Sequence, residues 1–316
     1  MTDTALPLLI THSGGFHCDE AFAYVVLQQA LGLHRPGGDH RLLRTRDAAA
    51  IAQGDYVWDV GTVFDPAARR FDHHQRGAPV RPDGTPFSSA GLVWQQYGEA
   101  AVAALLRAGG GEEGLAPAIA AELDRSLVRR IDEIDNGVAG SREPLDLASL
   151  VGDCNLPWDV PAEGRQAAED AAFLDAVALV EQVLRRRVAV LRARLAADAL
   201  VAAAHAASAD PRILELDRGM PWKGAVFAHD LPVLFAVYPV PNGNWMVDAM
   251  PPEPGSFAQR LPLPQDWAGL QDAALAAASG VPDAVFVHLR RFVGAARSRA
   301  GAVEMARRTI ARHGAG

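Results

Sequence analysis

Short apolar runs alternate with longer helix-like segments through the first 150 residues of the chain. PLLITH ends at His12, and the apolar segment EAFAYVVLQQAL that follows is typical of a buried helix that stops at Gly32. DYVWDVG (55–61) has the β-rich composition of a buried parallel strand and ends near Asp59. This alternation predicts an α/β layer with a mainly parallel sheet.

Two further helices are predicted after that strand. SSAGLVWQQYG (88–98) opens with two serines that can cap a helix. In the same way, Asp19 is placed to cap the earlier helix EAFAYVVLQQAL. Within 117–137 apolar side chains recur at helical spacing, and Asn136-Gly137 supplies a stop. The recurring residues are Ile119, Leu123, Leu127, Ile131 and Ile134.

The second half of the chain has a different pattern. A long helical stretch without proline or glycine fills 165–207, and we expect it to connect two domains. From Ile213 onward the pattern is β-rich, with a hairpin predicted at PNGN, then a helix, a strand, a turn over RRFVGAARS and a final helix. We therefore predict an α/β domain over 1–164, a helical connector, and a smaller α+β domain over 208–316.

Composition narrows the class of protein. The 316 residues suffice for two domains, and the net charge of −8 argues against sequence-independent adhesion to nucleic acid. The two cysteines, Cys18 and Cys154, form no CxxC pair. The N-terminus lacks a basic segment, and no apolar run reaches about 18 residues. We expect a cytoplasmic protein without a membrane span, and the sequence leaves the oligomeric state open, a homodimer included.

Histidines and acids gather in two short stretches, THSGGFHCDEAFAY and RRFDHHQRG. Their members are His12, His17 and Asp19 in the first and His73 and His74 in the second. Neutral imidazoles beside carboxylates bind Mn²⁺-like ions. Ligands collect at the carboxyl ends of strands in open α/β sheets, so we expect Asp59 to lie beside them. Each residue alone has an ordinary explanation, such as a helix cap or a loop histidine, whereas together they predict a metal site.

Asp135 adds an energetic argument. It lies in the last turn of its predicted helix, where a carboxylate meets the negative end of the helix dipole at a cost of roughly 0.3–1 kcal/mol. A bound cation would remove that conflict. Asp132, on the same helix, is expected to be a plain surface acid.

These stretches resemble the Myg (melanocyte proliferating gene one) family, a branch of the DHH phosphoesterase superfamily that also includes RecJ-like exonucleases and manganese pyrophosphatases. Besides the two histidine-containing stretches, the matching segments include RTRD, VWDVG, SSAGLVW, IDEIDNG, GNWMVDAMP, WAGLQDAAL, GVPDAVFVH and GAVEMA. The resemblance runs nearly end to end. It implies a DHH-type catalytic domain followed by a DHH-associated substrate-binding domain.

The resemblance also implies two divalent metal ions, with Mn²⁺ expected and Mg²⁺ or Co²⁺ as alternatives. The implied ligands are His12, His17, Asp19, Asp59, His73 and Asp135. Asp59 would bridge the ions, and His74 would face the substrate phosphate. The superfamily motif His-x-x-x-Asp-x-Asp is altered here, because the spacing differs by one residue and His17 replaces the middle acid. The Myg branch shares that change.

In the C-terminal domain, phosphate-binding residues are expected around RRFVGAARSR. Myg relatives usually carry a Gly-Gly pair there, whereas Gly294 is followed by two alanines, and its neighbouring backbone amides can still meet a phosphate. Arg297 and Arg299 supply forked donors suited to phosphate, with a solvated basic turn as the alternative. Arg76 and Lys223 are further substrate-binding candidates.

The implied function is a metal-dependent phosphodiesterase that acts as an exonuclease on single-stranded RNA or DNA ends, with RNA favoured. Two ions about 3.5–4 Å apart would activate water and clamp the attacking and leaving oxygens. Two alternatives stay open: a hydrolase of short oligonucleotides or small phosphorylated metabolites, and a non-catalytic metal- or nucleotide-binding protein. The intact ligand set argues against the last of these.

Overall fold

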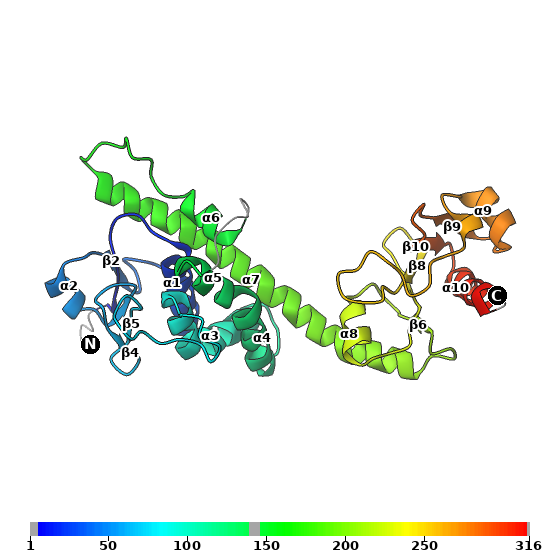
Figure 1. The fold of residues 1–316 in the computed structure, drawn as a ribbon, viewed down its shortest axis with the longest axis horizontal. Coiled ribbons are helices and arrows are strands. Elements are labelled where there is room, and N and C mark those ends of the chain that lie inside the picture. Colours follow the sequence, from blue (N-terminus) through cyan, green and yellow to red (C-terminus); the bar gives the residue numbers. More distant parts are fainter. Residues whose placement is uncertain (1–5, 139–145, 315–316) are drawn as a thin grey trace. The chain divides into compact units, whose positions relative to one another are not determined.

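The computed structural model describes residues 6–138 and 146–314, which form two compact units (Figure 1). Unit 1 spans residues 1–192, and unit 2 spans 193–316. Within the described residues each unit has its own five-stranded sheet and its own apolar core.

Unit 1 is built on a parallel-rich sheet with the strand order β2-β1-β3-β5-β4. Its strands are β1 (Leu8–Thr11), β2 (Arg41–Arg44), β3 (Tyr56–Trp58), β4 (Phe64–Asp65) and β5 (Arg70–Phe71). β1 pairs in parallel with β2 and β3, β3 pairs in parallel with β5, and β4 is antiparallel at the edge. The adjacent strands β1, β3 and β5 therefore all end at the same side of the sheet, and the predicted α/β class with a mainly parallel sheet is confirmed.

Helices supply the rest of the core of unit 1. They are α1 (Cys18–Leu31), α2 (Ala48–Ala52), α3 (Ser89–Ala108), α4 (Ala116–Leu123), α5 (Arg129–Asp135), α6 (Leu147–Gly152) and α7 (Arg165–Ala206). α1 is buried from Cys18 to Gln29 because it is apolar on all sides, and it packs along α3. It ends, as predicted, at Gly32, whose φ of 68° is the left-handed conformation of a helix C-cap.

The predicted cap at the start of α1 was wrong. His17 is the N-cap residue, so Asp19 lies inside the first turn, where it is 1% exposed. The serine pair does lie at the start of α3, but Ser88 makes no side-chain cap bond. The Asp19 carboxylate and the Ser88 hydroxyl point instead into unit 1, where they contact His73 and Asp132.

The helical segment predicted over 117–137 is formed, but it is not a regular α-helix, because a π-helical turn over Asp124–Val128 lies between α4 and α5. In a continuous α-helix, positions eight residues apart differ by about 80° around the axis. The extra residue of a π-turn brings them to within about 20°. Asp124 and Asp132 both contact the guanidinium of Arg81, at 2.7 Å each, as this geometry allows.

Unit 2 is an α+β unit with the strand order β6-β7-β8-β10-β9. Its elements are β6 (Ile213–Glu215), α8 (Lys223–Ala228), β7 (Phe235–Pro239), β8 (Trp245–Ala249), α9 (Asp272–Ser279), β9 (Ala284–Val287), β10 (Val293–Ala296) and α10 (Arg299–Gly314). β7 and β8 form the predicted hairpin. Successive side chains of a strand point to opposite faces of the sheet. Phe235 and Val247 therefore pack in the core on the face covered by α10, whereas Ala236 packs on the other face in a second cluster with α8.

The turn predicted over RRFVGAARS was wrong, because its centre is strand β10. Gly294 is buried there and pairs with Val247 on one side and Val287 on the other. The run Gly-Ala-Ala lacks the β-branched side chains that mark strands, so the pattern concealed it. Close packing explains the small residue, since a Cβ at Gly294 would lie 3.0 Å from the carbonyl oxygen of Phe286.

α7 contributes side chains to the cores of both units. Phe173, Val180 and Leu184 join the core of unit 1, and Val201 joins a cluster of unit 2. The boundary between the units, after Arg192, therefore falls inside this helix. Neither α7 nor any other helix of the described ranges is both long and apolar enough to cross a membrane.

Candidate metal centre

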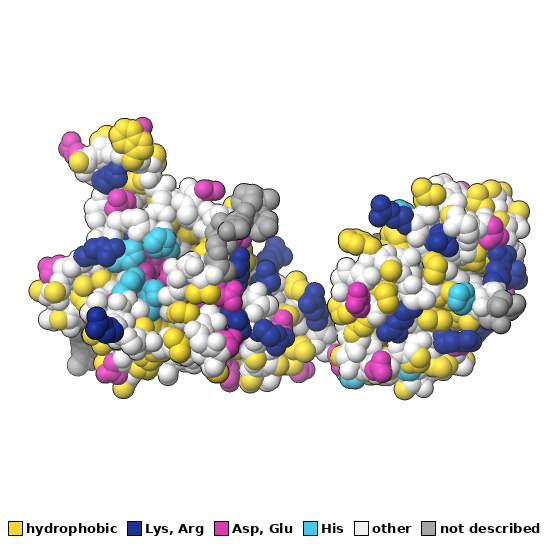
Figure 2. Space-filling view, in the orientation of Figure 1, with side chains coloured by type: hydrophobic (Ala, Val, Ile, Leu, Met, Phe, Trp, Pro, Cys, Tyr) yellow, Lys and Arg dark blue, Asp and Glu magenta, His cyan; other side chains and the backbone are white. Residues whose placement is uncertain are grey.

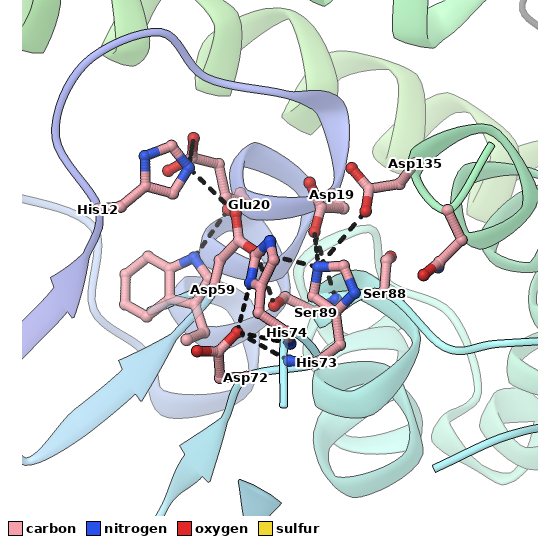
Figure 3. A network of polar contacts seen from close by, with 12 residues as sticks. His12, Asp19, Glu20, Asp59, Asp72, His73, His74, Ser88, Ser89 and Asp135 are labelled. Atoms are coloured by element: carbon pink, nitrogen blue, oxygen red, sulfur yellow. Dashed lines mark hydrogen bonds and ion pairs between the residues drawn. The ribbon is translucent and has the colours of Figure 1, made fainter. Parts of the chain in front are cut away.

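The histidines and acids singled out in the sequence lie together in unit 1. His12 follows β1, Asp59 follows β3, and the Asp72–His74 motif follows β5. These strands are parallel neighbours, so their ends bring the three segments to one place (Figure 3). In the space-filling view, histidine side chains gather around acidic ones on the visible face of unit 1 (Figure 2).

One group of side chains surrounds Asp59, and we call it the Asp59 set: His12, Glu20, Asp59, His73 and His74. Nε2 of His12 lies 3.2 Å from Asp59 Oδ2 and 2.9 Å from Glu20 Oε1. Nε2 of His73 lies 3.2 Å from the other carboxylate oxygen, Asp59 Oδ1. Asp59 therefore faces an imidazole with each of its two oxygens.

A second group, which we call the Asp19 set, combines His17, Asp19 and Asp135. One potential ligand atom from each lies within 4.8 Å of the others. They come from the start of α1 and the end of α5. Nε2 of His73 links the two sets, at 3.4 Å from Asp135 and 3.8 Å from Asp19 (Figure 3).

The two sets differ in their protonation. Burial opposes protonation of His12, but the carboxylates of Asp59 and Glu20 outweigh it and raise the pKa of His12 to about 10. Burial likewise opposes the ionised form of Asp59, yet His12 and His73 hold the pKa of Asp59 below its usual range. Burial and the neighbouring charges of Asp59 and Asp135 instead raise the pKa of Asp19 well above its usual range.

Several residues that hold the site in place were not predicted. Asp72 is 1% exposed, and its Oδ1 accepts hydrogen bonds from the His73 amide at 2.8 Å and from His74 Nδ1 at 2.7 Å. The hydroxyl of Ser89 donates to Asp59 Oδ1 at 3.2 Å. Asp59 itself has a φ of 56°, a left-handed backbone that is uncommon outside glycine and that directs its carboxylate into the site.

Glu20 was missed although the sequence contains a signal for it. It is the second of two carboxylates in the first turn of a largely apolar helix, and it is fully buried. Its Oε2 accepts from the Thr11 hydroxyl at 2.9 Å, and its Oε1 faces His12. A charged residue in such a helix indicates a partner, which is here the imidazole at the end of β1.

The expectation that Asp132 is a surface acid was wrong. It is fully buried and accepts hydrogen bonds from Arg81, from the amide and hydroxyl of Ser88, and from the Gly91 amide. The π-turn brings Asp132 to the same side of the helical segment as Asp124, toward Arg81. This network joins α5, which ends in Asp135, to the start of α3.

The composition and packing of both sets fit divalent cations. Imidazole nitrogens and carboxylate oxygens are ligands suited to Mn²⁺-like ions. Asp19 Oδ1 is buried and has no hydrogen-bond donor among the described residues, so the set lacks a positive partner at that atom. A cavity of about 610 Å³ lies over His12, Asp59 and His74, large enough to admit a substrate group.

The remaining predicted substrate residues lie elsewhere. Arg76 is exposed two residues beyond His74. The others are in unit 2: Arg297 forms an exposed ion pair with Asp272, and Arg299 pairs with Glu215. Gly294 is engaged in the sheet, and Lys223 begins α8 and pairs with Asp248 at 3.1 Å. The open phosphate-binding turn expected around Gly294 is therefore not formed.

Comparison with known proteins matches nearly the full length of the chain to one family. Residues 8–310 match the model MYG1_exonuc, described as an uncharacterised protein family (UPF0160). The protein named MYG1 exonuclease from Homo sapiens is 36% identical over 334 residues, which cover 97% of this chain and 86% of the human protein. No solved structure matches the chain.

Two further relatives extend the match beyond vertebrates. MYG1 protein C27H6.8 of Caenorhabditis elegans is 34% identical, with 96% of this chain and 95% of the relative covered. MYG1 protein YER156C of Saccharomyces cerevisiae is 28% identical, with 96% and 95% covered. The chain belongs to the MYG1 family.

Proposed function

We propose that this protein is a metal-dependent phosphodiesterase that removes nucleotides from the ends of single-stranded RNA or DNA. The observation that supports it best is the pair of ligand sets, joined by His73, beside one open cavity. The name exonuclease in four of its mammalian relatives supports the reaction class. We further propose that unit 1 contains a DHH-type catalytic domain over residues 1–164.

We propose two divalent cations, with Mn²⁺ as the first candidate, one at each set. The proposed ligands are His12, His17, Asp19, Asp59, His73 and Asp135, with Glu20 added by the structure. When bound, such cations supply Lewis-acid activation of water and neutralise charge on a phosphoryl group. Asp59 contacts His73, the imidazole that also lies 3.4 Å from Asp135 of the Asp19 set, which supports Asp59 as the carboxylate that would serve both cations.

His74 is the proposed contact to the substrate phosphate. Its side chain is 56% exposed, whereas the side chains of His12 and His73 are nearly buried. Asp72 holds Nδ1 of His74 at 2.7 Å, which fixes the ring and leaves Nε2 for a second proton. A ring held in this way can donate a hydrogen bond to a phosphate oxygen or a proton to the leaving group.

Residues 208–316 are the proposed substrate-binding domain, linked to the catalytic domain through 165–207. The exposed guanidinium groups of Arg297 and Arg299 are the proposed phosphate contacts there. Their ion pairs with carboxylates are solvent-accessible and therefore weak, so a phosphate can replace the carboxylate as the partner of each arginine. The net charge of −8 offers little long-range attraction to a polyanion. Few phosphates should therefore be contacted, and a single-stranded end is the expected substrate.

The test uses the full chain stripped of metal with a chelator. Linear oligonucleotides of RNA and DNA, labelled at the 5′ or the 3′ end, are incubated with and without Mn²⁺, beside a blunt duplex and a circular single strand. We expect Mn²⁺-dependent shortening from one end, little action on the duplex, and none on the circle. Equal activity after chelation would refute the metal site, and rapid cutting of the circle would refute the exonuclease assignment.

A further inference from the structure

A cavity of about 740 Å³ lies in unit 2, and none of its lining residues belongs to the candidate metal centre. It is bordered by the end of α7, the start of α8, strands β7 and β8, and the loop after β8. Its walls include Arg194, Met220, Trp222, Lys223, Tyr238 and Asp248. A mainly apolar pocket of this size with a few converging polar groups is typical of a small-molecule site.

Lys223 is the only lysine of the chain. The sequence contains 30 lysine and arginine residues, and the other 29 are arginine. The ammonium of Lys223 lies 3.1 Å from Asp248 Oδ1 and 5.3 Å from the centre of the Trp222 ring. An ammonium is a compact point charge, whereas a guanidinium is a wide planar fork, so Lys223 presents to the pocket a charge of a different shape from that of every other basic side chain of the sequence.

Asp248 is a largely buried residue of the pocket lining and can accept further hydrogen bonds. Its side chain is 13% exposed, and burial raises its pKa above the usual range although Lys223 opposes this. The hydroxyl of Tyr238 donates to Oδ2 at 3.2 Å, and Lys223 donates to Oδ1. Each carboxylate oxygen can accept a second donor, and the ammonium has further N–H groups. The pair can therefore bind both a donor and an anion of a ligand.

The border of the pocket supplies a second cation. Arg194 is exposed on α7 and has no ion pair within the described part of the chain. The nearby Asp198 is engaged by His229 at 2.8 Å, so it does not neutralise Arg194. Apolar walls, an inner carboxylate, and two cations thus lie around one cavity.

We propose that this pocket binds one unpaired nucleotide of a nucleic-acid strand. The base packs against Met220, Trp222 and Tyr238, and Asp248 accepts hydrogen bonds from its N–H groups. The adjoining phosphate is bound by Lys223 and Arg194. The choice of a nucleotide rests on the proposed function. The pocket alone would fit any ligand that combines an aromatic ring with a phosphate, and the proposed nucleic-acid substrate selects the nucleotide among these.

The single lysine allows a direct test that does not depend on catalysis. The full chain is treated with an acetylating reagent in chelator, and modification of Lys223 and of the N-terminal amine is followed by mass spectrometry. We expect adenosine monophosphate to slow acetylation of Lys223 at least fivefold, with inorganic phosphate and adenosine having weaker effects and the N-terminal amine unaffected. No protection by any of the four nucleoside monophosphates at millimolar concentration would overturn the proposal.

Variants test the assigned contacts. Binding of a fluorescent trinucleotide to the full chain carrying Asp59→Asn is measured by anisotropy, with Arg194→Ala, Lys223→Arg and Asp248→Asn added singly. Each is expected to weaken binding about fivefold or more, whereas Arg307→Ala removes the same charge at an exposed position outside the pocket and should leave binding unchanged. Equal weakening by Arg307→Ala would overturn the proposal.

The two proposals fail in different ways. Nucleotide protection of Lys223 in a protein that hydrolyses no nucleic acid would refute the exonuclease and retain the pocket as a nucleotide site. Hydrolysis without protection of Lys223 would retain the exonuclease and refute the pocket.

Discussion

The Asp59 set and the Asp19 set are neighbours, but their carboxylates are neutralised in opposite ways. Asp59 faces an imidazole with each oxygen, at 3.2 Å in both cases, and its ionised form is stabilised. Asp19 faces other carboxylates, its Oδ1 has no donor among the described residues, and its ionised form is disfavoured. The protein therefore supplies an imidazole to each oxygen of Asp59, whereas Asp19 Oδ1 gains a partner only from an added proton or cation.

This difference follows from the elements that build each set. The Asp59 set brings together the ends of three parallel strands, which contribute both histidines and acids. The Asp19 set brings together the start of α1 and the end of α5, where Asp135 meets the unfavourable end of its helix dipole. A cation at the Asp19 set would relieve several unfavourable charge interactions at once.

The largest expected effects come from neutralising one acid in each set. Asp59→Asn and Asp19→Asn should each lower nuclease turnover by about 10²–10³. Their effects on the metal-free melting temperature should have opposite signs, measured in chelator by circular dichroism. Asp59→Asn should lower it because His12 and His73 lose their partner, and Asp19→Asn should raise it by a few degrees because a buried repulsive charge is removed.

The contrast between the two sets requires that the melting temperature change in opposite directions in Asp59→Asn and Asp19→Asn. Two melting temperatures that both fall would mean that the Asp19 carboxylate is stabilised as well as that of Asp59. Near wild-type turnover of Asp59→Asn in saturating Mn²⁺ would refute its proposed role between the cations. A folded far-ultraviolet spectrum for both variants is the control.

Asp132 is the carboxylate of α5 whose charge is neutralised by a side chain of the protein, Arg81, and not by a proposed metal ion. It is paired with Arg81 at 2.7 Å and is fully buried, so Asp132→Asn should destabilise unit 1 by about 3 kcal/mol. The turnover of the folded fraction should stay within a few fold of wild type. Asp135→Asn, one turn further along, should show the reverse: little loss of stability and a large loss of turnover. A large loss of turnover in Asp132→Asn at full folding would contradict this division.

The sequence predicted the Asp59 set better than its surroundings. Strand ends can be recognised from short apolar runs, and parallel order brings them together, so His12, Asp59 and His73 could be grouped. Tertiary contacts that depend on the exact rotation of a helix could not be predicted from the sequence. A π-turn has no strong sequence signal, so the inward position of Asp132 was missed. The strand that contains Gly294 was missed as well, because Val293 is its only β-branched residue.

The pH dependence of stability provides a third comparison. The pKa of His12 is raised from 6.5 to about 10 by Asp59 and Glu20, which outweigh the effect of burial. A raised histidine pKa stabilises the folded state fully below pH 6.5, and that stability is lost as the pH rises toward 10. The melting temperature of the metal-free protein should therefore fall over this range.

Metal affinity should change in the opposite direction over the same pH range. Binding requires neutral imidazoles and releases protons, so divalent-cation affinity should increase as the pH rises. The slope of melting temperature against pH should be shallower in Asp59→Asn, which removes one cause of the raised pKa of His12. A flat profile for the wild-type protein in chelator would show that His12 is neutral in the fold.

The smallest expected effect separates the two sets at a single residue. The Ser89 hydroxyl donates to Asp59 Oδ1 at 3.2 Å, while its backbone amide donates to Asp19 Oδ2 at 3.3 Å. Ser89→Ala removes the hydroxyl's contacts with Asp59 and with the Phe71 carbonyl oxygen at 3.0 Å but keeps the backbone bond to Asp19. It should lower turnover roughly fivefold, equivalent to about 1 kcal/mol for one hydrogen bond to the Asp59 set. Steady-state kinetics in saturating Mn²⁺ measures this loss.

The adjacent serine is the matched control for that measurement. The Ser88 hydroxyl donates to Asp132 at 2.8 Å and has no contact with either set in the described structure. Ser88→Ala should therefore lower stability by about 1–2 kcal/mol, because a buried charged acceptor loses a donor, and should leave turnover unchanged. If Ser88→Ala lowered turnover as much as Ser89→Ala, the Asp132 network and the Asp59 set would act as one unit. The distinction between acids neutralised for stability and acids held for a cation would then fail.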